Sequence, residues 1–69
     1  MKYAAMAAAL TRTAHLEKLS PEERNAAMHA ANAFRLVEDF LEHNAPCVVE
    51  LEVLVQAEET YKRQIEDAS

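Results

Sequence analysis

The stretch Leu19-Ser20-Pro21-Glu22-Glu23 decides how this chain is divided. Ser20 suits the N-cap of a helix, proline is favoured at the first helical position, and Glu23 stands where a capping box has its carboxylate. Ser20 also precedes a proline, which biases it away from helical geometry. The stretch therefore predicts that one helix ends before it and that another begins at about residue 21.

A second break follows at Asn44-Ala45-Pro46. Proline again suits a first helical turn and disfavours a helical residue before it. The two breaks predict helices at about 3–18, 21–43 and 46–67. Because the connections are short, successive helices should lie side by side.

Composition supports an all-α fold and limits its stability. The 69 residues include no glycine and only one cysteine. Such a small domain has marginal stability, and a single cysteine excludes an internal disulfide, which leaves very good helix packing or self-association to stabilise it. The sequence therefore predicts one helical domain, residues 1–69, in which a hairpin of helices 21–43 and 46–67, with an extra N-terminal helix, dimerises into a helix bundle.

The two long helices carry apolar seams with alternating spacings of 3 and 4 residues. The first seam contains Ala27, Ala30, Phe34, Val37 and Leu41, and the second contains Cys47, Leu51, Leu54, Glu58, Tyr61, Ile65 and Ala68. We expect the core or dimer interface at Phe34, Val37, Leu41, Leu51, Leu54, Tyr61 and Ile65. On the outer face of the last helix, Glu58 and Lys62, and likewise Glu59 and Arg63, stand four residues apart and suit ion pairs.

The start of the last helix has an alternative interpretation. Residues 49–53, Val-Glu-Leu-Glu-Val, alternate as a strand does. A lone strand would have to pair with its copy in a dimer, as in ribbon-helix-helix regulators, whose surface is basic. We favour a helix over 48–55.

A stripe on the other side of helix 21–43 suggests a partner surface. It contains Arg24, Met28, Ala31 and Arg35, again at spacings of 4, 3 and 4. Methionine and arginine are enriched in interfaces, so Arg24, Met28 and Arg35 are candidate anchors for a protein target. The alternative is that the first helix folds back over Met28. Further candidate anchors lie on that first helix, namely Tyr3, Met6 and Leu10.

Catalytic, metal and cofactor motifs are missing from the sequence. His15, His29 and His43 follow one another at intervals of fourteen residues, which is about 21 Å along a helix, so His29 and His43 cannot share a metal within one chain. Asp39 and His43 suit only weak ion binding, and Cys47 is expected to pack, with an intersubunit disulfide as the alternative. We expect no enzyme activity, no cofactor and no metal.

Charge and hydropathy restrict the partners. The net charge of −5 divides into +2 over residues 1–37 and −7 over residues 38–69. An acidic chain repels phosphate backbones, which makes nucleic-acid binding an unfavoured alternative. The longest apolar run, residues 3–10, is too short to span a membrane, and a lone cysteine fits the cytoplasm.

Two families have a similar plan. The seams of the two long helices resemble Rop-like helical hairpins, RNA-binding proteins that dimerise into four-helix bundles. In length, charge and lack of catalytic motifs, the chain also resembles small phage-encoded anti-quorum-sensing inhibitors of host proteins. That resemblance implies a short helical dimer whose partners are a LuxR-type quorum-sensing activator and the type IV pilus assembly ATPase, and it assigns no site residues.

The expected function is therefore a homodimeric protein-binding module that inhibits a host regulator. One alternative is a nucleic-acid-binding regulator of the Rop or helix-turn-helix kind, which would use the basic side chains Arg12, Lys18, Arg24 and Arg35. Another is an accessory subunit of a larger assembly. The sequence leaves the identity of the target open, as well as the choice between inhibitor and adaptor.

Overall fold

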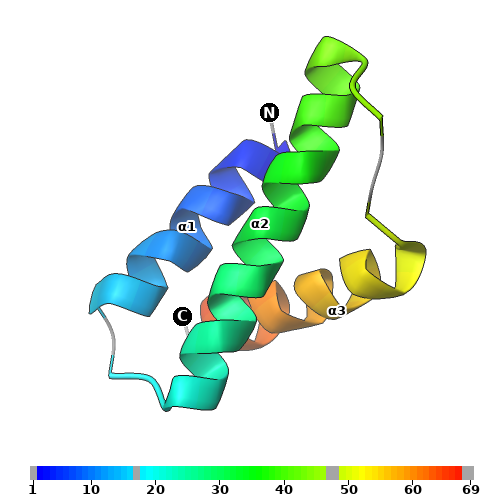
Figure 1. The fold of residues 1–69 in the computed structure, drawn as a ribbon. Helices are drawn as coiled ribbons and strands as arrows, with labels where there is room; N and C mark the ends of the chain where they lie inside the picture. Colours follow the sequence, from blue (N-terminus) through cyan, green and yellow to red (C-terminus); the bar gives the residue numbers. More distant parts are fainter. Residues whose placement is uncertain (1, 17, 47–48, 68–69) are drawn as a thin grey trace.

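The protein is all-α, as its sequence predicts. A computed structural model describes residues 2–16, 18–46 and 49–67, and these contain no strand. Three α-helices, α1 (Lys2–Leu16), α2 (Pro21–His43) and α3 (Leu51–Tyr61), are followed by a short π-helix, η1 (Lys62–Glu66). Helix α2 is the central element, and α1 and α3 both pack against it (Figure 1).

Helix α2 begins and ends where the sequence predicts. Ser20 is extended at its N-cap, and its hydroxyl accepts a hydrogen bond of 3.2 Å from the amide of Glu23. Asn44 follows the helix with φ 54°, the left-handed conformation that asparagine tolerates better than most residues. The carboxylate of Glu23 does not complete a reciprocal capping box, because it accepts hydrogen bonds from η1 instead.

Helix α1 lies alongside α2 and ends two residues before the predicted boundary at 18 (Figure 1). Alanines on both helices let the backbones approach closely, and Leu10 and Phe34 fill the contact with no exposed surface. The ring of Tyr3 stacks on that of Phe34, with 5.7 Å between the ring centroids. The buried residues of α1 and α2 belong to one core cluster, which also includes Ala57 of α3; they are Met6, Ala7, Leu10, Ala14, Ala27, Ala30, Ala31, Ala33 and Phe34.

Polar contacts join α1 to α2 at two points, near the start and near the middle of α1. The buried carboxylate of Glu38 accepts a hydrogen bond of 3.2 Å from the amide of Ala4, in the first turn of α1. A negative charge is favourable there, because a helix N-terminus carries unpaired amides and positive dipole charge. Further along, the guanidinium of Arg35 donates to the hydroxyl of Thr11 over 2.7 Å.

Helix α3 begins at Leu51, so the prediction of a helix from residue 46 is wrong. Glu50 is extended, with φ −73° and ψ 150°. The residue before it, Val49, and the fourth helical residue, Leu54, both pack against the core. These are the positions of a hydrophobic staple, which fixes the angle at which a chain enters a helix. The strand interpretation also fails for residues 51–53, which are helical.

Helix α3 crosses α2 obliquely near the N-terminal half of α2 (Figure 1). Only Ala57 and Thr60 of α3 are buried. The predicted seam therefore lies to one side of the contact: Leu54, Tyr61 and Ile65 are half-buried, and Leu51 is 77% exposed. The C-terminal turns of α2 extend beyond both neighbouring helices.

The π-helix η1 ties the end of the described chain to the start of α2. Its wider turn is closed by a hydrogen bond of 2.8 Å from the amide of Asp67 to the carbonyl of Lys62. Arg63 and Gln64 then reach Glu23, over 3.0 Å and 2.9 Å respectively. Both hydrogen bonds lower the pKa of Glu23, with Gln64 the larger cause.

Candidate protein-binding groove

Most of the buried core is made of alanine, whereas several larger apolar side chains remain exposed. Leu10 and Phe34 are the largest fully buried side chains. The exposed ones are Leu16, Leu36, Leu41, Leu51, Val53 and Val55. Single exposed apolar residues are ordinary, but neighbouring ones indicate an interaction surface.

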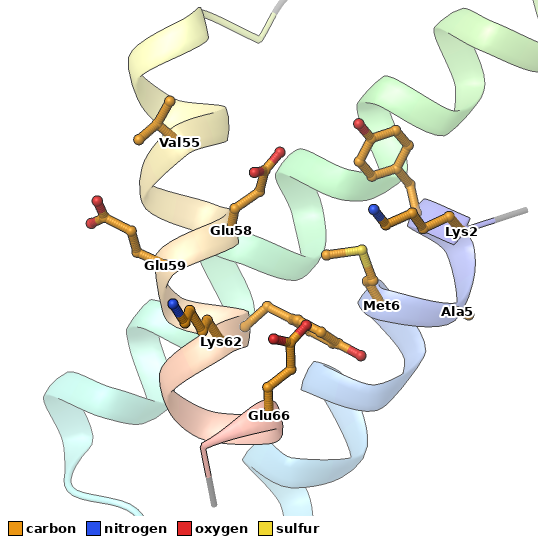
Figure 2. A pocket seen from close by; sticks show the side chains of 10 residues that line it. Lys2, Ala5, Met6, Val55, Glu58, Glu59, Lys62 and Glu66 are labelled. Atoms are coloured by element: carbon orange, nitrogen blue, oxygen red, sulfur yellow. The ribbon is translucent and has the colours of Figure 1, made fainter.

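A groove separates the first turns of α1 from α3 and η1 (Figure 2). Its volume is about 530 Å³, enough for several side chains of a partner. The lining residues are Lys2, Tyr3, Ala5, Met6, Val55, Glu58, Glu59, Tyr61, Lys62 and Glu66. In Figure 2, Met6 extends from α1 toward α3, and Glu58 extends from α3 toward α1.

Both helices that border the groove contribute apolar side chains to it. Met6 and the ring of Tyr3 contribute from α1, while Val55 and Tyr61 contribute from α3. Leu51 lies one helical turn before Val55 and so continues the apolar strip beyond the groove. Methionine and tyrosine suit such a surface because they offer large contact areas that adapt to a partner.

Carboxylates edge the groove on the α3 side. Neither of the predicted pairs, Glu58 with Lys62 or Glu59 with Arg63, is among the ion pairs of the described residues. Arg63 instead pairs with Glu23 across the molecule, at 3.0 Å. Glu58 and Glu59 are exposed, and their carboxylates have no hydrogen-bond or ion-pair partner in the described part of the chain, so they are available to a cationic side chain of a binding partner.

The stripe proposed as a target surface is divided between buried and exposed positions. Ala31 is fully buried, Met28 is half-buried against the core, and Arg35 donates to Thr11 of α1. The stripe is therefore partly used within the chain, and its use by a protein target stays a prediction. Arg24 is exposed.

The candidate anchors on the first helix are also packed within the chain. Leu10 is fully buried, Met6 is 8% exposed and Tyr3 is half-buried. A partner would reach Leu10 only if α1 left α2. Met6 and Tyr3 differ, because each presents part of its side chain to the groove.

The seven residues expected in the core or dimer interface are distributed across three environments. Phe34 is fully buried. Leu41 is 53% exposed and Leu51 is 77% exposed. Val37, Leu54, Tyr61 and Ile65 lie between these extremes.

No group of three metal-ligating side chains gathers anywhere in the described residues. His43 and Asp39 do form a pair, with 2.8 Å between Nδ1 and Oδ1, and both are exposed. Cys47 lies outside the described residues. The groove is therefore the strongest candidate site, and its chemistry suits binding.

Comparisons with known proteins add no relative. No protein-family model, curated protein or solved structure matches the chain.

One feature of the sequence pointed to this groove, but the regular spacing of the apolar seam made it easy to miss. Glu58 interrupts the apolar seam of 46–67, and Val55 widens the apolar surface beyond it. An acidic residue within an apolar stripe marks the edge of a contact. The groove also needs α1 as its second side, and helix periodicity alone does not show where α1 lies relative to α3.

Proposed function

We propose that the chain is a non-enzymatic protein-binding module, a homodimeric inhibitor or anti-activator that occupies the surface of a regulator. The observation that carries this proposal is the groove between α1 and α3, with its apolar side chains and the exposed carboxylates of Glu58 and Glu59. An adaptable apolar surface of this kind suits recognition of another protein.

The groove fits one amphipathic helix of a target. In helix-in-groove recognition, apolar side chains at i, i+3 or i+4, and i+7 enter a hydrophobic channel between helices. Here they would contact Met6, Val55 and Tyr61. Lysine or arginine beside them would meet Glu58 and Glu59, and the net charge of −5 would raise the association rate of a basic partner.

The resemblance to anti-quorum-sensing inhibitors supplies the first targets to test. These are a LuxR-type activator and the type IV pilus assembly ATPase. None of the helices in the described residues is long and apolar enough to cross a membrane. We propose that the chain meets its target in the cytoplasm, where its single cysteine would remain reduced.

Binding to a short synthetic helix of leucine and lysine tests the groove directly. We expect Val55→Ser to weaken this binding about tenfold, equivalent to ~1.4 kcal/mol, in a fluorescence anisotropy titration. Leu16→Ser is the matched control, because Leu16 is 78% exposed but does not line this groove. Equal losses in the two variants would refute the groove as the binding site.

The charge contribution has its own matched pair. Glu58→Gln should weaken binding of the same peptide and reduce its salt dependence, because a carboxylate at the rim is lost. Glu42→Gln removes the same charge from an exposed position on α2 and should change binding little. Equal affinity for a leucine–glutamate helix would show that charge does not select the partner. Co-elution of each candidate regulator with wild type, but not with Val55→Ser, then tests the target.

A further inference from the structure

A second hollow lies on a different face, between α2 and α3. Its volume is about 230 Å³. The lining residues are Ala26, His29, Ala30, Val53, Gln56, Ala57 and Thr60. Unlike the groove between α1 and α3, it has no lysine, arginine, aspartate or glutamate among the described residues that line it.

Exposed apolar side chains stand beside this hollow. Val53, on its α3 side, is 43% exposed. Leu36, which is 45% exposed, follows His29 by seven residues and therefore lies on the same face of α2, two turns further along. One face of the molecule thus carries both a shallow apolar hollow and protruding apolar side chains.

That combination is what a two-fold symmetric interface needs. In such an interface the same patch faces itself, so protrusion and hollow must occur on one surface. A patch facing itself can also bring like charges together. The groove, whose lining holds three carboxylates and two lysines, has a net negative charge and is therefore a less favourable self-interface than the hollow, among whose described lining residues none is a lysine, arginine, aspartate or glutamate. We infer that a second copy of this chain docks on the face between α2 and α3, with Leu36 and Val53 of each copy packing over the hollow of the other.

The size of the molecule is consistent with this assignment. A standard interface covers roughly 800 Å² per partner, about a sixth of the 4836 Å² surface of this chain. The inference rests on the dimeric part of the proposed function and leaves the groove between α1 and α3 free for a target. Dimer formation and target binding are therefore separable by mutation.

Light scattering after size exclusion tests the interface. Wild type should have about twice the 7.7 kDa chain mass. Leu36→Asp and Val53→Asp, on different helices, should each yield monomers, with helical content checked by circular dichroism. Leu16→Asp adds the same charge at a more exposed leucine away from this face and should remain dimeric.

Three results would overturn the inference. They are a monomeric wild type, a dimer that survives both Leu36→Asp and Val53→Asp, and a dimer dissociated by Leu51→Asp but not by Leu36→Asp. A monomeric Leu36→Asp that still binds the leucine–lysine helix would support two separate surfaces. If Leu36→Asp and Val53→Asp dissociate a dimeric wild type that does not bind that helix, the proposed target groove fails while the dimer interface stands.

Discussion

The contacts that α2 makes with its two neighbours differ in completeness. Against α1, large and small side chains interlock, and Leu10 and Phe34 have no exposed surface. Against α3, only Ala57 and Thr60 of the partner helix are buried, while Leu51, Val53 and Val55 remain 43–77% exposed. The chain thus closes its core on one side of α2 and leaves apolar surface on the other.

This difference separates stability from binding. Full burial of a leucine or valine side chain stabilises a fold by about 1.5–3 kcal/mol. The single chain does not gain this stabilisation from the exposed side chains of α3. A target or a second copy would realise it. Substitutions in the contact between α1 and α2 should therefore change folding, whereas substitutions on the open side should change association.

The largest expected effect is on Phe34. Phe34→Ala removes a fully buried ring that stacks on Tyr3 and should lower the free energy of unfolding by about 3–5 kcal/mol. Leu51→Ala deletes an exposed side chain and should change the free energy of unfolding by less than about 0.5 kcal/mol under monomeric conditions. Urea titration followed by circular dichroism measures both. Similar losses for the two variants would show that the open side also stabilises the single chain.

A smaller effect is expected at Glu38, which anchors the first turn of α1. Glu38→Ala removes the charged group that accepts a hydrogen bond from the amide of Ala4, and it should lower the free energy of unfolding by about 1.5–3 kcal/mol. Glu38→Gln keeps an acceptor oxygen and should cost less. Amide hydrogen exchange should show the loss of protection concentrated in α1 rather than α3. A uniform loss would mean that α1 does not open independently of the other helices.

The same two contacts explain how much of the fold could be predicted from the sequence. The predicted bounds of α2 were correct at both ends, because Ser20, Pro21 and Pro46 act through local backbone geometry. The predicted start of α3 was wrong by five residues. The true start depends on Val49, which packs against a core made largely by α1 and α2. Periodicity identifies an apolar face but does not say which neighbour covers it.

The candidate site was less predictable for a related reason. The stripe of Arg24, Met28 and Arg35 has the composition of an interface, yet much of it serves the contact with α1. The groove is made by residues about fifty positions apart, so it exists only once α1 and α3 are placed in space. Glu58 in an apolar seam was the local clue, and Arg63 pairing with Glu23 rather than Glu59 was not visible in the spacing.

The smallest expected effect concerns pH, at the contact between η1 and α2. Hydrogen bonds from Gln64 and then Arg63 lower the pKa of Glu23 in the folded chain. Since the unfolded pKa is the higher one, this contact stabilises the fold above that value and loses its contribution as the pH falls through the lowered pKa. From about pH 5 to about pH 3, the melting temperature of wild type should fall slightly more than that of Glu23→Gln. Glu22→Gln, the neighbouring exposed carboxylate, should behave as wild type. Parallel curves for wild type and Glu23→Gln would show that Arg63 and Gln64 do not favour the charged carboxylate, and that η1 is held by apolar contacts such as those of Ile65.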